Sequence, residues 1–245
     1  MARIDDALAE ALKQLPAKPD DSASAPVKKA YSEKISAVVA LALAKELRDR
    51  GLAEARPAGP GDLGDDSGAE RRMAGGLGAK KVDVTWATEP SGLLLGISVK
   101  TINFRDSKTK NFQKNLINRR GDMLMEAVTL HRRFPYAVLC ALFFLDKEAA
   151  KDDTGRRRST FLNAHQRLQL FTDRPDPAGR EEQFERFYLL LLDASPSKVK
   201  IETYRVGKSD KAVPLDDVLN DLLQLVAQRN PDFYEFEGGS LKRAT

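Results

Sequence analysis

Two short segments near the middle of the chain have the patterns of neighbouring β-strands. Lys80–Thr85 alternates charged or polar positions with apolar ones, and Leu93–Lys100 is apolar over most of its length. The intervening segment Thr88–Gly92 contains proline, serine and glycine, which are common in turns. The pattern predicts a β-hairpin. The preceding glycine-rich run, Gly75–Gly78, is expected to let the backbone turn tightly or approach a site closely.

This hairpin is expected to bring an aspartate close to a lysine. Alternate residues of a strand point to opposite faces, so Ser98 and Lys100 share one face, while Asp83 points away from Val82 and Val84. A charged residue between two valines is costly to bury without a partner. Two interpretations follow: a plain ion pair between Asp83 and Lys100 on a sheet edge, or a site that binds a metal ion and a phosphate.

Apolar residues at helical spacing account for much of the remaining chain. The second predicted helix is apolar on two sides, so we expect it to be largely buried, and Gly51 is expected to end it. The pattern predicts helices at residues 1–15, 27–50, 111–134, 159–171 and 215–229.

Three further apolar segments predict strands. Tyr136–Leu145 is apolar throughout, which is typical of a central strand that is buried on both faces. Arg186–Leu192 and Lys198–Val206 follow, the latter expected in a third layer. Long loops are expected at 54–78 and 147–158. The order of elements predicts an α/β sandwich with a mixed central sheet flanked by helices on both faces.

The composition is typical of a soluble globular protein. Of 245 residues, 42% are hydrophobic and 31% are charged, and the net charge is +4. The single cysteine, Cys140, cannot form an internal disulfide, which fits a reducing cytoplasm. The first residues lack the apolar core of a signal peptide, and no apolar run reaches the roughly 20 residues of a membrane helix. We therefore expect a cytoplasmic protein without membrane contact.

The scarcity of histidine and cysteine narrows the metal chemistry. His131, His165 and Cys140 are too few to build a zinc site of the usual ligand count. The remaining hard ligands are carboxylates, which suit Mg²⁺ or Mn²⁺.

The order of three elements resembles a known family. Glu33 on a helix, then Asp83, then the triplet Ser98-Val99-Lys100 is similar to the PD-(D/E)xK nuclease superfamily, which has the restriction-endonuclease-like fold. The resemblance spans about residues 27–145. It implies a nuclease domain at 27–237, preceded by an N-terminal helix and flexible linker at 1–26 and followed by a tail at 238–245.

The chain departs from the family pattern at two positions. Ser98 stands where the family has an acidic residue, and Val82 stands where it has proline. Some restriction enzymes with serine at this position use a glutamate of the following helix, for which Glu126 is the candidate. The alternative is that Glu126 lies on the solvated side of an amphipathic helix. Glu33 is expected to be buried, because it lies in line with small residues such as Ala37.

The resemblance implies metal-assisted hydrolysis of phosphodiester bonds. Asp83, with Glu33 or Glu126 and the backbone carbonyl of Val99, would hold Mg²⁺ or Mn²⁺, which lowers the pKa of a bound water. Lys100 would orient or help to deprotonate the water and would stabilise the developing charge. The implied catalytic set is Asp83, Lys100, Glu33 and Ser98.

Positive charge is concentrated directly after the second strand. Between Lys100 and Arg120 there are seven basic residues and one acid, Asp106. Such a stretch favours contact with nucleic acid, although charged runs are often only solvated surface. For Arg156–Arg158 we expect the solvated surface. The predicted nucleic-acid contacts are Lys80, Lys81, Arg105, Lys108, Lys110, Lys114, Asn115, Arg119 and Arg120.

The sequence thus predicts a divalent-metal-dependent endonuclease that acts on DNA, with RNA as an alternative substrate. The resemblance suggests a restriction or anti-phage defence system, a homodimer and a partner protein from that system. One alternative is a catalytically inactive subunit of the same fold that binds nucleic acid or a partner, with Ser98 marking lost catalysis. Another is an assembly subunit whose basic helix meets an acidic partner.

Overall fold

The structure is a computed structural model that describes residues 3–64, 68–195 and 198–244. None of its helices within these ranges is long and apolar enough to cross a membrane. The described residues form five α-helices, α1 (Arg3–Lys13), α2 (Ala25–Asp49), α3 (Lys114–His131), α4 (Thr160–Leu168) and α5 (Leu215–Arg229), and two short 3₁₀ turns, η1 (Lys147–Ala150) and η2 (Gln169–Phe171).

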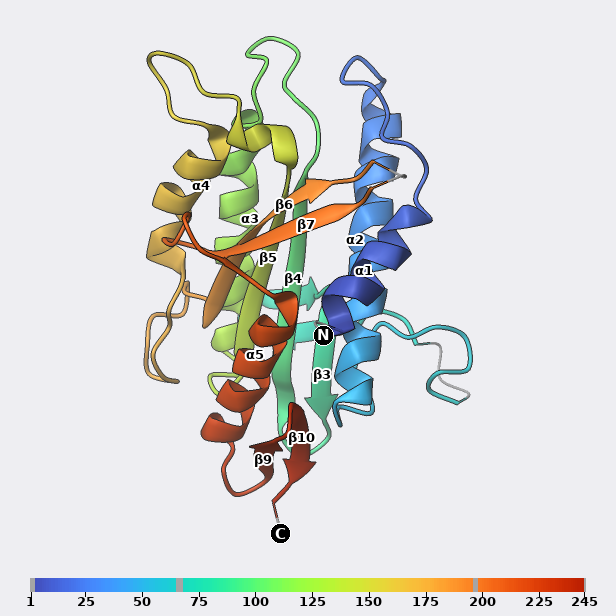
Figure 1. The fold of residues 1–245 in the computed structure, drawn as a ribbon. Coiled ribbons are helices and arrows are strands. Elements are labelled where there is room, and N and C mark those ends of the chain that lie inside the picture. The colour runs from blue at the N-terminus through green and yellow to red at the C-terminus, as the bar shows by residue number, and fades with distance from the viewer. Residues whose placement is uncertain (1–2, 65–67, 196–197, 245) are drawn as a thin grey trace.

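The strands form a mixed sheet and two hairpins (Figure 1). The strands are β1 (Arg72–Gly75), β2 (Gly78–Lys81), β3 (Val84–Thr88), β4 (Gly92–Ile102), β5 (Val138–Asp146), β6 (Arg186–Asp193), β7 (Lys200–Arg205), β8 (Ala212–Val213), β9 (Tyr234–Glu237) and β10 (Ser240–Arg243). The central sheet has the order β3-β4-β5-β6-β7-β8. Its β4–β5 and β5–β6 pairs are parallel, and its other pairs are antiparallel.

Helices cover both faces of this sheet, which confirms the predicted mixed α/β arrangement. One face packs against α1, α2 and α5, and the other against α3 and α4 (Figure 1). In β5, Cys140 and Leu142 belong to the first cluster, and Leu139 and Phe143 belong to the second. The continuous apolar run therefore forms a strand that is buried on both faces, as expected.

The N-terminal helix and the C-terminal residues pack onto the main body. Ile4, Leu8 and Leu12 of α1 lie in the same hydrophobic cluster as α2. Gly51, which ends α2, has φ +100°, and a Cβ there would lie 2.2 Å from the Leu241 carbonyl oxygen. The backbone N–H of Leu241 donates a hydrogen bond to the backbone carbonyl of Arg50 at 2.8 Å. The expected tail thus forms β10, which is held against the end of α2.

Three predictions about strands and loops are wrong. The expected strand Lys80–Thr85 is interrupted: β2 ends at Lys81, β3 begins at Val84, and Asp83 lies in the break. As a result Val82 and Val84 pack into different clusters on opposite faces of the sheet. Part of the expected loop 54–78 forms the β1–β2 hairpin. β7 is not in a third layer, because it pairs with β6 in the central sheet.

A buried histidine on α4 gives a prediction about pH. His165 Nδ1 accepts a hydrogen bond from the Gly207 N–H at 3.0 Å, while its Nε2 is buried without a partner among the described residues. Burial lowers the pKa of His165 to about 4. Between about pH 6.5 and pH 4, the unfolded chain therefore binds a proton that the folded chain excludes.

We expect the free energy of unfolding to fall as the pH drops through this window, by up to about 3 kcal/mol from this residue. His165→Asn keeps an acceptor for Gly207 but does not titrate, so its unfolding should depend less on pH. Urea unfolding of both proteins at pH 7, 5.5 and 4.5 tests this. Parallel pH profiles would contradict the prediction.

Candidate functional site

The break between β2 and β3 creates the candidate site. Pairing of β3 with β4 begins at Val84, opposite Ile97. Beyond it, the Asp83 Oδ2 accepts a hydrogen bond from the Val99 N–H at 2.7 Å. A side-chain carboxylate thus takes the place of a strand carbonyl. Because the N–H and C=O of one strand residue face the same neighbour, the Val99 carbonyl also faces the Asp83 side.

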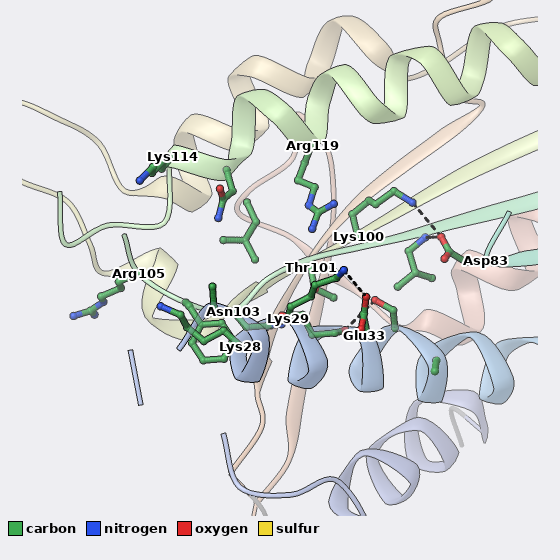
Figure 2. Close-up of a pocket in the computed structure, with 18 of the residues that line it drawn as sticks. Lys28, Lys29, Glu33, Asp83, Lys100, Thr101, Asn103, Arg105, Lys114 and Arg119 are labelled. Atoms are coloured by element: carbon green, nitrogen blue, oxygen red, sulfur yellow. Dashed lines mark hydrogen bonds and ion pairs between the residues drawn. The ribbon is translucent and has the colours of Figure 1, made fainter. Parts of the chain in front are cut away.

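Lys100 lies between two carboxylates from different elements. Its Nζ is 3.2 Å from Asp83 Oδ2 and 3.5 Å from Glu126 Oε2 on α3. The side chain of Lys100 is 17% exposed and that of Glu126 is 6% exposed. Figure 2 shows the ammonium of Lys100 reaching the Asp83 carboxylate. The expected approach of Asp83 and Lys100 is therefore present, and Glu126 completes a buried cluster.

Ser98 lies on the same side of β4 as Lys100. It is 2% exposed, and its Oγ makes no hydrogen bond within the described part of the chain. The hydroxyl is nevertheless close enough to Glu126 to favour the charged form of that carboxyl. The acidic position of the family pattern is thus occupied by a buried hydroxyl beside a buried glutamate.

The electrostatics of the cluster favour a charged lysine. Burial lowers the pKa of Lys100, but attraction by Glu126 and Asp83 outweighs it and holds the pKa above its usual value. Burial raises the pKa of Glu126, and the positive charge of Lys100 opposes this increase. Lys100 is therefore protonated near neutral pH and can act as a fixed positive charge, which makes it a poor general base.

Glu33 is not buried, which corrects the expectation. Its side chain is 66% exposed, and its carboxylate lies 3.7 Å from the ammonium of Lys29. Ala37, one turn after Glu33, is exposed and lines an open pocket, whereas Ala40 and Ala44, farther along the same row, are buried in the core. Glu126, for which the solvated side of a helix was the alternative, is the buried glutamate.

The pocket has a volume of about 860 Å³ and contains Asp83 and Lys100 in its lining. We call it the basic pocket. Figure 2 shows Lys28, Lys29 and Glu33 of α2 along one wall, and Lys114 and Arg119 of α3 along the other. The Lys and Arg residues in the lining are Lys28, Lys29, Lys81, Lys100, Arg105, Lys114 and Arg119, against the acids Glu33, Glu70, Asp83 and Asp106.

The predicted nucleic-acid contacts fall into two groups. Those that line the basic pocket are Lys81, Arg105, Lys114, Asn115 and Arg119. Those outside its lining are Lys80, Lys108, Lys110 and Arg120. The Arg120 guanidinium lies 5.8 Å from the centre of the Phe171 ring. The positive charge of Lys80 lowers the pKa of Glu126, and Lys81 forms an ion pair with Glu70.

Sequence reasoning missed the α2 wall of the basic pocket. Lys28, Lys29 and Ser32 line it, and the Asn103 side chain donates to Ser32 Oγ at 3.0 Å. Asn103 is buried at the end of β4, so this hydrogen bond joins the strand that carries Lys100 to the facing helix. The Lys28-Lys29 pair, one turn before Glu33, was the available signal.

The oxygen atoms of the cluster suit a hard divalent cation, and of the two glutamates expected as alternatives only Glu126 lies with Asp83 beside Lys100. No group of three Asp, Glu, His or Cys side chains in the described ranges is placed to hold a metal ion. Glu33 lies apart from the cluster, on the α2 wall of the basic pocket, where it faces Lys29. Asp83, Glu126 and the Val99 carbonyl remain, and Mg²⁺ is commonly held by one or two carboxylates plus water.

Comparisons of the chain with protein-family models, with curated proteins and with solved structures found no match. The resemblance to PD-(D/E)xK nucleases therefore stays a prediction from the sequence.

Proposed function

We propose that this protein is a divalent-metal-dependent nuclease of restriction-endonuclease-like fold that hydrolyses phosphodiester bonds in DNA. The observation that carries the proposal is the half-buried Lys100, which is held between Asp83 and Glu126 and opens onto the basic pocket. A lysine and two carboxylates beside the basic pocket are suited to binding a phosphate and a metal ion together.

Each residue of the cluster has a role in this proposal. Asp83, Glu126 and the Val99 carbonyl would hold Mg²⁺ or Mn²⁺, which supplies an activated water and neutralises charge at the phosphate. The Val99 N–H fixes the Asp83 carboxylate by its hydrogen bond of 2.7 Å. Lys100 stabilises negative charge on the phosphate oxygens, and its raised pKa favours this role over proton abstraction.

Cleavage of plasmid DNA tests the proposal directly. Purified protein is incubated with supercoiled plasmid and Mg²⁺ or Mn²⁺, with a chelator in the control, and with single-stranded RNA in a parallel reaction. We expect nicked or linear plasmid products that require the metal ion. Intact DNA at every metal concentration would overturn the proposal, and cleavage of RNA alone would reassign the substrate.

The second candidate is a catalytically inactive subunit that binds nucleic acid. Two observations favour it: Ser98 replaces an acid, and no third carboxylate joins Asp83 and Glu126 in the described part of the chain. This protein would retard DNA in a low-salt gel but leave it uncut with any divalent metal ion.

Glu126 and Glu33 are expected to differ strongly in their importance for cleavage. Glu126→Gln removes a buried charge next to Lys100, so we expect cleavage to slow by about 100-fold or more. Glu33→Gln alters an exposed carboxylate on the other wall, so we expect a change of only a few fold. Initial rates of plasmid nicking measure both, with thermal unfolding as a check on folding. Equal losses of cleavage rate in the two variants would contradict the prediction and would mean that Glu33 matters for cleavage as much as Glu126.

A further inference from the structure

Two loops stand side by side at the end of the molecule where β4 and β5 finish (Figure 1). Residues 103–113 follow β4 and residues 147–159 follow β5. Asp152 joins them, because its Oδ2 accepts a hydrogen bond from the Phe112 N–H at 3.1 Å. The same carboxylate accepts from the Thr160 N–H at 2.6 Å, at the start of α4. The loops therefore form one body, which we call the two-loop platform.

The carboxylates of these loops are largely used to build them. Asp106 accepts from the backbone N–H groups of Lys108 and Thr109 at 3.1 and 2.9 Å, and it pairs with Lys114 at 2.6 Å. Asp152 is 9% exposed and is occupied by the bonds described above. Negative charge is thus largely turned inward. The exceptions are the exposed Asp153 and Glu148, whose side chain is 39% exposed and pairs with Arg105 at 3.8 Å.

Most cations of the platform, in contrast, are exposed and have no ion pair among the described residues. The exposed side chains without an ion pair among the described residues are Lys108, Lys110, Lys151, Arg156 and Arg158. Arg157 differs, because its guanidinium donates to backbone carbonyls within its own loop and holds the loop in shape. Unpaired cations on two linked loops repel one another, so the arrangement favours a polyanion that contacts them together.

We propose that the two-loop platform is a second DNA-binding surface that continues the basic pocket and holds phosphates on one side of the scissile bond. This inference rests on the proposed function. Arg105 and Lys114, at the base of the first loop, line the basic pocket, so the platform begins where the pocket ends. Arg156 and Arg158 extend the positive surface to the second loop. This proposal departs from the expectation that Arg156–Arg158 is only solvated surface, with which the exposure of Arg156 and Arg158 is also compatible.

Binding of duplex DNA at several salt concentrations tests the platform. Arg156→Ala/Arg158→Ala removes two exposed charges that bind nothing in the described structure. The matched control is Lys208→Ala/Lys211→Ala, which removes two exposed charges from the turn after β7. Fluorescence anisotropy is measured without divalent metal, so that no cleavage occurs, on a duplex of about 30 base pairs. We expect the platform variant to bind about tenfold more weakly and to lower the salt slope by about 2, and the control to match wild type.

A short duplex of about 6 base pairs spans about 20 Å and separates the two proposals. It should fill the basic pocket without reaching the platform, so wild type and the platform variant should bind it equally. If wild type binds no DNA at low salt, the proposed function fails. If wild type binds the long duplex and the platform variant keeps the same affinity and salt slope, the platform inference fails alone. An equal loss on both duplexes also overturns it, because the effect would then be one of net charge.

Discussion

Lys100→Met and Asp83→Asn should each slow DNA cleavage by about a thousandfold, while DNA binding falls only a few fold. Lys100 is the cation that lies between Asp83 and Glu126, and removal of one such preorganised charge costs about 10²–10³ in rate. Asp83→Asn keeps an acceptor for the Val99 N–H but weakens the hold on both the lysine and the metal ion. Single-turnover cleavage and metal-free anisotropy, on the same protein preparations, separate chemistry from binding.

The lysine variant also has a consequence for folding that a catalytic defect alone would not produce. Without Lys100, the largest influence that opposes the burial-driven rise in the pKa of Glu126 is lost, and only Ser98 and Lys80 still oppose it. A folded-state pKa above the unfolded value means that the folded chain binds the extra proton, so stability is higher at low pH and is lost as pH rises. Lys100→Met should therefore lose more stability relative to wild type at pH 8 than at pH 5.5.

A lysine elsewhere on the surface provides the control for Lys100. Lys211→Met removes an exposed amine after β7 and should leave both the cleavage rate and the pH profile of unfolding unchanged. Cleavage by Lys100→Met at the wild-type rate would exclude the cluster as the catalytic centre. Equal stability losses at both pH values would show that Glu126 is not the group that Lys100 neutralises.

Local patterns were sufficient for some of the fold and part of the site. The predicted helix 215–229 coincides with α5, because its apolar spacing is regular. Alternation placed Ser98 and Lys100 on one face of β4, opposite Ile97 and Val99, and the packing follows it. In both cases neighbours along the sequence determine which face is buried.

Packing between distant segments was beyond these patterns. The α3 helix, which carries the buried Glu126, packs against both β4 and the β1–β2 hairpin, and helical periodicity does not show that hairpin. Gly75 reveals the contact in the structure: a Cβ there would lie 2.4 Å from the Thr129 carbonyl oxygen, and the Gly76 N–H donates to that same oxygen at 2.7 Å. The glycine run was correctly expected to allow close approach, but its partner on α3 could not be inferred.

The predicted burial of Glu33 was wrong for a related reason. A row of small residues on a helix is equally compatible with tight packing and with the wall of an open pocket. The position of α2 is set by contacts far away in the sequence, including the hydrogen bond from Asn103 to Ser32. The row is buried at Ala40 and Ala44 but lines the basic pocket at Ala37, so Glu33, one turn earlier, requires no buried partner.

Glu185→Gln should cause the largest loss of stability, about 3–5 kcal/mol in the free energy of unfolding. Glu185 is 0% exposed, and its carboxylate accepts hydrogen bonds from Arg229 at 2.7 Å, from Arg174 at 3.2 Å and from the Leu139 N–H at 2.6 Å. Burial alone would raise its pKa, but His131, Arg229 and the Leu139 N–H hold the pKa below the usual value. Loss of the charge leaves two buried guanidinium groups without a counter-ion.

Urea unfolding followed by circular dichroism measures the effect, and Glu181→Gln is the matched control. Glu181 pairs with Arg132 at 2.8 Å on the surface, so its loss should cost at most about 1 kcal/mol. Because the folded-state pKa of Glu185 is lowered, its contribution is fully present above its unfolded value of about 4.3 and is lost as the pH falls from there through the lower folded-state pKa. The two variants should therefore converge in stability at acid pH. Similar stabilities at pH 7 would mean that the buried arginines find other partners, and Glu185 would then not be the residue that ties β5, β6 and α5 together.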